Sequence, residues 1–298
     1  TDTRLGFKNL IQPQMKCRIC DKSNLEKIGS LGNIAISDFT EKPSKGDKYP
    51  LDLVYCQDCA LLQLDEVAPR EKLYSKYWYR SAINPVIVND LREIAKEVKG
   101  ARVCDIGAND GTLLSFLPDG WIKIAVDPSD IYPKGFIWIK DYWEDVCLEE
   151  KFDTITAIAM LYDLPDPNKF IFNIKKHLDT NGIFIAQLMT LQPMIENNDL
   201  GNICHEHIEF YSYKSLVKLF EQNGLEIYRV ELNGMNGGSY RIFARHYKTG
   251  SVDFKEKEYT IDELKDFFSR IENNKVQLKK HLKGKKIYGY GASTKANT

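Results

Sequence analysis

Two pairs of cysteines near the start of the chain have the spacing of a metal site. Each pair is a Cys-x-x-Cys motif, and together they comprise Cys17, Cys20, Cys56 and Cys59. Two such turns can direct four thiolates at one centre, which is the tetrahedral coordination of structural Zn²⁺ in proteins. Four protein ligands leave no position for water, so we expect the zinc to be structural. A redox dithiol pair or two disulfides are the alternatives, although the chain has seven cysteines and a disulfide framework favours an even number.

A glycine turn in the middle of the chain has the pattern of a nucleotide-cofactor site. The stretch is Asp105-Ile106-Gly107-Ala108-Asn109-Asp110-Gly111. Gly107 allows a sharp turn at the carboxyl end of a strand, and Gly111 leaves room for a ligand against the next helix. A dinucleotide fingerprint would need glycine at positions 109 and 112, where this chain has Asn109 and Thr112, so NAD is disfavoured. The pattern instead resembles that of class I methyltransferases, in which this turn holds the methionine half of S-adenosylmethionine.

Residues beyond the turn could complete the same site. Asp127 ends the next predicted strand, and a carboxylate there can accept both ribose hydroxyls of a nucleoside. Asp141 and Tyr142 could frame the adenine with a polar edge and an aromatic face, and Met160 follows the fourth strand, where the sulfonium is expected. The alternative is an ordinary α/β turn followed by a surface acid.

A second group of chemically active side chains is the triplet His205-Glu206-His207. In an extended segment the two histidines would point the same way and could ligate a metal. Only two ligands are visible, however, and no His-Glu-x-x-His helix is present. Buried histidines with satisfied partners are another interpretation. We favour acid–base or substrate-binding residues, because imidazole titrates near neutral pH.

The elements that must position these residues follow a regular order. From residue 101 apolar runs of strand length alternate with helical segments, at 101–106, 122–126, 136–139, 154–159 and 183–188. This alternation predicts an α/β fold, a Rossmann-like sheet covered by helices on both faces. Two later strands, at 225–232 and 239–246, should add an antiparallel pair. A small zinc-binding module precedes the sheet.

The same pattern predicts three parts: a zinc-binding module over residues 1–68, a cofactor-binding domain over 69–250, and a linker helix with the start of another α/β domain over 251–298. The last part ends in a strand and a glycine turn with no helix behind them. We therefore expect the natural protein to continue beyond Thr298.

Composition limits the partners. The formal net charge is −1, so we expect neither nucleic acid nor a membrane surface as a partner. No apolar run approaches the ~20 residues that span a bilayer, and the first fifteen residues lack the features of a secretory signal. A cytoplasmic protein is the expectation, and the sequence carries no signal for its oligomeric state.

Taken together, the motifs resemble those of the sugar C-methyltransferases, which act on nucleotide-linked deoxy-ketosugars. The segments that carry the resemblance are Cys17–Cys59, Tyr77-Trp78-Tyr79-Arg80-Ser81, Asp105–Leu114, His205-Glu206-His207, Gly237–Arg241 and Gly289–Ala292. The family combines a zinc module, a cofactor domain and a C-terminal α/β domain that helps to hold the nucleotide sugar.

The resemblance implies C-methylation of a nucleotide-linked keto-deoxysugar, with S-adenosylmethionine as cofactor and a structural zinc. It implies that His207 is the base, that Glu206 orients a histidine or binds a substrate hydroxyl, and that Tyr77 or Tyr79 donates to the enolate oxygen. Two residues depart from the family pattern: Cys204 stands where a tyrosine is usual, and Asn236 where a histidine is common. These departures keep open a non-sugar small-molecule acceptor. The end of the sequence at a glycine turn keeps open a binding module that has lost catalysis.

Overall fold

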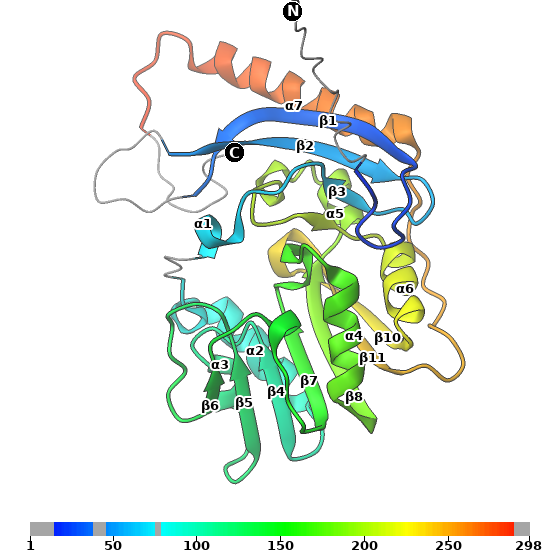
Figure 1. The fold of residues 1–298 in the computed structure, drawn as a ribbon. Coiled ribbons are helices and arrows are strands. Elements are labelled where there is room, and N and C mark those ends of the chain that lie inside the picture. The colour runs from blue at the N-terminus through cyan, green and yellow to red at the C-terminus, as the bar shows by residue number, and fades with distance from the viewer. Residues whose placement is uncertain (1–14, 38–45, 75–78, 289–298) are drawn as a thin grey trace, which may run out of the picture.

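The structure is a computed structural model that describes residues 15–37, 46–74 and 79–288. A small antiparallel sheet and a long helix lie above a larger, mostly parallel sheet (Figure 1). This is the predicted α/β architecture with a preceding cysteine-rich module. No helix in the described part of the chain is long and apolar enough to cross a membrane.

The small sheet has the strand order β1-β2-β3-β9. Its strands are β1 (Leu25–Ala35), β2 (Lys48–Cys56), β3 (Leu62–Leu64) and β9 (Glu209–Phe210). The first three strands come from the cysteine-rich segment, whereas β9 comes from a segment about 145 residues later that directly follows His207. The histidine triplet is therefore tied to the N-terminal module through β3 and β9, which pair antiparallel.

The large sheet has the strand order β10-β11-β8-β7-β4-β5-β6. Its strands are β4 (Arg102–Ile106), β5 (Ile122–Val126), β6 (Ile137–Ile139), β7 (Phe152–Ile158), β8 (Leu178–Met189), β10 (Leu225–Asn233) and β11 (Ser239–His246). The pairs among β4 to β8 are parallel, and β11 pairs antiparallel with both β8 and β10. The predicted antiparallel pair at the end of the sheet is confirmed.

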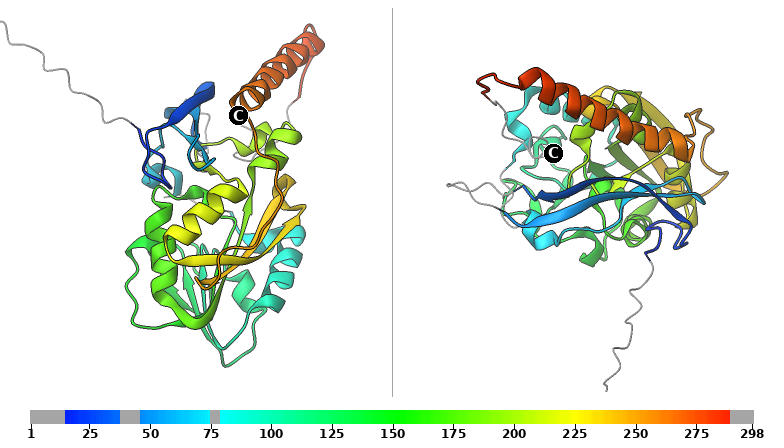
Figure 2. Two further views of the ribbon diagram at one scale, coloured as in Figure 1. Left: turned by 90° about the vertical axis from the view of Figure 1, so that its right-hand side faces the viewer. Right: turned by 90° about the horizontal axis from the view of Figure 1, so that it is seen from above.

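Helices cover this sheet. They are α2 (Pro85–Glu97), α3 (Thr112–Ser115), α4 (Pro167–His177) and α6 (Tyr213–Gln222), while α1 (Arg70–Tyr74) and α5 (Leu191–Glu196) lie toward the small sheet (Figures 1 and 2). Local sequence explains how the longer ones begin. The Asn84 side chain accepts from the Val86 N–H ahead of α2, and Ser212 accepts from the Ser215 N–H ahead of α6.

The last helix, α7 (Ile261–Leu282), packs on the N-terminal module. It begins with a capping box between Thr260 and Glu263. Phe268 lies so close over Gly29 of β1 that an added Cβ there would come within 2.4 Å of the ring, and Lys265 pairs with Glu26 at 2.5 Å. The segment expected to be a linker helix is therefore packed against the first strand of the chain.

Candidate functional site

The four predicted cysteines form one cluster. Their Sγ atoms all lie within 4.8 Å of one another, with 3.4 Å between Cys17 and Cys59 and 3.5 Å between Cys20 and Cys56. Ligands at the usual Zn–S length of about 2.3 Å in a tetrahedron have sulfurs roughly 3.8 Å apart, so the cluster fits zinc. The thiols are free rather than joined in disulfides.

The two turns that carry the cysteines have the same backbone form. The residue after the second cysteine of each pair is left-handed: Asp21 has a φ of 57° and Ala60 a φ of 62°. In each turn this residue donates its N–H to the carbonyl of the first cysteine, at 2.9 Å. Similar turns therefore approach the centre from the start of the chain and from the loop between β2 and β3.

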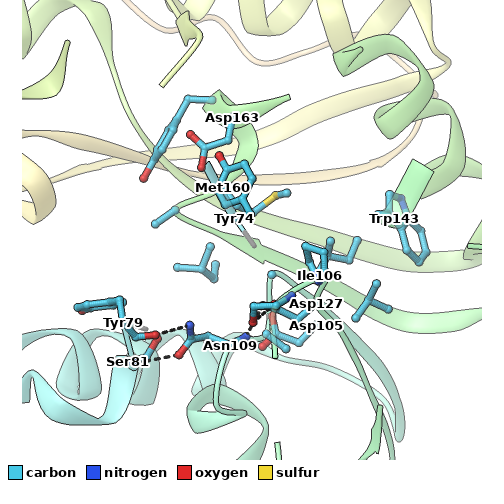
Figure 3. A pocket seen from close by; sticks show the side chains of 18 of the residues that line it. Tyr74, Tyr79, Ser81, Asp105, Ile106, Asn109, Asp127, Trp143, Met160 and Asp163 are labelled. Carbon is cyan, nitrogen blue, oxygen red and sulfur yellow. Dashed lines mark hydrogen bonds between the residues drawn. The ribbon is translucent and has the colours of Figure 1, made fainter. Parts of the chain in front are cut away.

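A cavity of about 350 Å³ lies at the carboxyl ends of the parallel strands, where ligands bind in open α/β sheets. Figure 3 shows Asp105, Asn109 and Asp127 together on one side, across from Met160 and Asp163. The predicted residues that line it are Tyr79, Asp105, Gly107, Asn109, Asp127, Asp141, Tyr142, Met160, Glu206 and His207. Asp110, Gly111 and His205 are not among the lining residues, and Tyr77 lies outside the described residues.

Asn109 holds the glycine turn together. Its N–H donates to Asp127 Oδ2 at 2.8 Å, its Nδ2 donates to the Tyr79 carbonyl at 2.9 Å, and its Oδ1 accepts from the Ser81 N–H at 3.0 Å. Asn109 has a φ of 52°, a conformation that asparagine tolerates better than most residues. Asn109 thus holds both Tyr79 and Asp127 against the glycine turn. The position of Asn109 in the glycine motif did not predict this role.

Asp127 is buried at the end of β5. Its Oδ1 accepts from the Ser129 N–H at 2.9 Å and from the Ser129 hydroxyl at 2.5 Å, in addition to the Asn109 bond on Oδ2. An ionised carboxylate accepts about four hydrogen bonds. Three are therefore used within the protein, which leaves room for about one bond from a ligand.

The two glycines of the turn have different surroundings. Gly107, with a φ of +67°, lies against Met160 in the cavity, and an added Cβ would come within 3.1 Å of the Met160 side chain. Gly111, with a φ of +78°, lies under Phe136 and Pro133, which an added Cβ would meet at 2.7 and 3.0 Å. The space over Gly111, which the sequence led us to expect for a ligand, is filled by the protein's own side chains.

Asp110 caps the next turn instead of facing the cavity. Its Oδ1 accepts from the Thr112 hydroxyl at 2.5 Å, and its Oδ2 accepts from the Ala82 N–H at 3.0 Å. Like Asn109, it ties the segment before α2 to the glycine turn.

Asp105 is buried at the end of β4, where it accepts a hydrogen bond from the Thr156 hydroxyl at 2.6 Å. Burial raises the pKa of Asp105 to about 7, the Thr156 bond opposes this rise, and the charge of Asp127 adds to it. Asp105 is therefore a cavity carboxyl that titrates near neutral pH.

This pKa predicts how stability depends on pH. Between the ordinary value of 3.8 and about 7 the folded protein holds a proton on Asp105 that the unfolded chain releases. The contribution of Asp105 to stability therefore falls as pH rises through this window and is constant above it. We expect the free energy of unfolding of wild type, relative to Asp105→Asn, to decline over that range. Urea unfolding at several pH values measures it, and two parallel curves would refute the assignment.

Arg70 is a cavity residue that the sequence did not suggest. Its guanidinium lies over the Tyr142 ring, 3.8 Å from the centroid, and its Nη2 is 3.2 Å from Glu144 Oε1. Next to Tyr142, the exposed Asp141 accepts the Tyr142 N–H at 2.8 Å. Arg70 is a single arginine on a five-residue helix, so no local motif marked it.

The histidine triplet does not act as one unit. His207 lines the cavity, its Nδ1 is 2.9 Å from the Asn202 carbonyl, and its ring lies edge-on to Tyr162 with centroids 4.6 Å apart. His205 is buried on the side of the small sheet, with Nε2 3.0 Å from the Tyr49 carbonyl. A carbonyl only accepts hydrogen bonds, so the proton of a neutral His207 is on Nδ1 and Nε2 is its basic nitrogen. The segment is bent rather than extended, which is why the two imidazoles have different partners.

Comparisons with known proteins agree with this geometry. Residues 79–230, about half of the chain, match the family model described as "Methyltransferase domain", and residues 17–74 match the one described as "Putative zinc binding domain". The C-methyltransferase NovU of Streptomyces niveus is 24% identical over 335 aligned residues, covering 98% of this chain and 79% of that protein. A tRNA U34 carboxymethyltransferase of Sulfurimonas denitrificans is 28% identical over 109 residues, covering 32% of this chain and 37% of that protein.

Among solved structures, the glycopeptide N-methyltransferase MtfA in complex with S-adenosyl-L-homocysteine is 14% identical, with a TM-score of 0.44, and covers 54% of this chain and 87% of that one. The match to the family model, rather than the likeness to solved structures, identifies the family of this chain, because that model alone covers half of the chain. The chain belongs to the methyltransferase-domain family, as an S-adenosylmethionine-dependent methyltransferase with an N-terminal zinc-binding domain.

Proposed function

We propose that the protein transfers a methyl group to a carbon atom of a nucleotide-linked keto-deoxysugar, with His207 as the base. The observation that carries the proposal is the position of His207 in the wall of the cavity. The alignment of nearly the whole chain with a C-methyltransferase supports transfer to carbon.

The cofactor residues fit S-adenosylmethionine, which supplies an electrophilic methyl group when it is bound. Gly107 and Asn109 would hold its methionine end, and Met160 lies across from Gly107, where the sulfonium would sit. Asp127 would accept a ribose hydroxyl through its remaining acceptor position. Tyr142, held by Arg70, would offer an aromatic face to the adenine.

The acceptor carbon must become nucleophilic before it can be methylated. A neighbouring ketone acidifies its C–H bond, and His207 Nε2 takes the proton while the electron pair of the C–H bond delocalises onto the ketone oxygen. The Asn202 carbonyl stabilises the imidazolium that results, because it accepts the Nδ1 proton. The carbon then accepts the methyl group that bound S-adenosylmethionine would supply, with its sulfur–methyl bond broken and S-adenosylhomocysteine as the leaving group. A donor near the ketone oxygen would stabilise the enolate, and Tyr79 lines the cavity for such a role.

Asp127→Asn is expected to weaken the binding of S-adenosylhomocysteine by about ten- to a hundredfold. The substitution removes a charge-assisted hydrogen bond, worth about 1.5–3 kcal/mol. Titration calorimetry measures the change. Asp130→Asn is the matched control, because Asp130 is an exposed acid in the same loop that pairs with Lys140. Equal affinities in wild type and Asp127→Asn would remove Asp127 from the cofactor site.

The substrate class is tested with S-adenosylmethionine that carries a ¹³C-labelled methyl group and a panel of nucleotide-linked keto-deoxysugars. We expect the label on carbon, which the methyl chemical shift distinguishes from a label on oxygen or nitrogen. Label on a heteroatom, or turnover only with other small molecules, would contradict the proposal.

A non-sugar acceptor is the second candidate, and Asn236 is the observation that favours it. Asn236 lines the cavity with a φ of 52°, and its carbonyl accepts from Asn202 Nδ2 at 3.4 Å. A histidine is common at this position in the sugar C-methyltransferases that the sequence resembles. The change therefore alters the acceptor end of the cavity itself.

A further inference from the structure

Asp163 is a carboxylic side chain in the cavity wall to which the reaction above assigns no role. It ends the short 3-10 turn Leu161–Asp163 that follows β7, and it lines the cavity close to Met160 (Figure 3). The residue as a whole is partly exposed to the cavity. Its Oδ1 atom, however, is buried and has no hydrogen-bond partner among the described residues. A buried carboxyl oxygen without a partner is costly when the group is ionised, which favours the neutral acid, and the rest of the side chain reaches the cavity.

The neighbours of Asp163 come from the segment that carries the proposed base. The Ile208 N–H donates to the Tyr162 carbonyl at 2.8 Å, which joins the Asp163 turn to that segment. Glu206 from the same segment also lines the cavity, and its Oε2 is likewise buried without a partner among the described residues. Two carboxyl groups, those of Asp163 and Glu206, thus line the same cavity as His207.

No cation accompanies Asp163 among the described groups that act on it. The acids that face it are Glu206 and the fully buried Glu209, and the other titratable groups around it are Tyr74, Cys204 and Tyr211. Arg18 lies 3.8 Å from Glu209, and Arg70, which lines the same cavity, pairs with Glu144. Burial and the charges of Glu206 and Glu209 raise the pKa of Asp163 well above its ordinary value, while a hydrogen bond with the Tyr74 side chain opposes this rise.

We propose that Asp163 is a neutral carboxylic acid that donates a hydrogen bond to the ketone oxygen of the acceptor. The inference rests on the proposed function and makes Asp163 a further catalytic residue of it. His207 takes the proton from carbon, and the electron pair that moves onto the ketone oxygen is stabilised by the Asp163 O–H. The proton stays on Asp163 throughout, so the step needs no other reactant.

Amide and alanine substitutions separate a neutral donor from an ionised carboxylate. Asparagine keeps a donor at position 163 without a charge, whereas alanine removes the donor. With S-adenosylmethionine and a nucleotide-linked keto-deoxysugar, Asp163→Asn should keep kcat/KM within about fivefold. Asp163→Ala should lose on the order of a hundredfold, as for a lost oxyanion donor. Asp145→Asn, at an exposed acid, is the matched control. An Asp163→Asn enzyme as inactive as Asp163→Ala would overturn the proposal.

Infrared spectroscopy tests the protonation state without any acceptor. Wild type at pH 7 should show the C=O stretch of a protonated carboxyl that Asp163→Asn lacks, and affinity for S-adenosylhomocysteine should be the same in both. Absence of that band overturns the inference even if the enzyme methylates keto-sugars. If the band is present but no keto-sugar is methylated, the proposed substrate class fails, and the donor role falls with it.

Discussion

His207→Ala should lower the rate of methyl transfer by about 10²–10⁴-fold, the range that a positioned general base contributes, while S-adenosylhomocysteine still binds within about twofold. His207 and Glu206 line the cavity and lie outside the glycine turn that would hold the cofactor. If His207 is the base, as proposed, the variant removes that base from the acceptor C–H and removes no contact to the cofactor. The measurement is single-turnover methyl transfer, with calorimetry for the cofactor product.

Two further variants sharpen this result. His207→Asn can still donate to the Asn202 carbonyl but offers no basic nitrogen, so it should be as inactive as His207→Ala. His281→Ala, on the exposed end of α7, should behave as wild type. In D₂O the acceptor should exchange its acidic C–H for deuterium only when His207 is present. Turnover of either His207 variant within a few-fold of wild type would show that another group is the base.

Cys59→Ser should abolish stoichiometric zinc binding and destabilise the N-terminal module. Cys59 is buried, with its Sγ 3.4 Å from that of Cys17. The loss removes one of four ligands from a closed site. Structural zinc supplies about 10–16 kcal/mol in small zinc-finger peptides, more than most domains have in total stability. Metal analysis and thermal unfolding measure the two effects.

The loss of zinc should also disturb the segment that carries His207, the proposed base. The turn that holds Cys59 leads into β3, which pairs with β9, and β9 directly follows His207. We therefore expect zinc-depleted protein to lose methyl transfer more strongly than affinity for S-adenosylhomocysteine. Cys147→Ser is the matched control because Cys147 is exposed and should change neither property. Full activity after complete removal of the metal would show that the module does not position His207.

Local patterns predicted the features that lie on short stretches of chain. Asp105 ends a strand, Gly107 forms the turn after it, and Asp127 follows the next strand. Neighbouring residues determine each of these features, and the parallel pairing of β4 with β5 brings them together. The four cysteines form the expected cluster because each Cys-x-x-Cys turn is a local structure. The alternation of apolar runs with helical segments was sufficient to predict the order of strands and helices in the chain, because parallel strands buried on both faces are uniformly apolar.

Features that depend on distant packing could not be predicted. Phe136 fills the space over Gly111, and it lies 25 residues later in the sequence. His205 and His207 have different hydrogen-bond partners because the chain bends between them. Asp163 and Arg70 lie in no motif, and only the fold brings Asp163 beside Glu206. The packing of α7 on β1 joins the two ends of the described chain, which periodicity does not reveal.

A crystal structure of the protein with S-adenosylhomocysteine tests the assigned cofactor site most directly. We expect the ligand in the cavity, with a ribose hydroxyl on the Asp127 carboxylate, the amino-acid end over Gly107 and Asn109, and the sulfur facing Met160 and His207. A ligand bound elsewhere, with Asp127 contacting only Asn109 and Ser129, would contradict it.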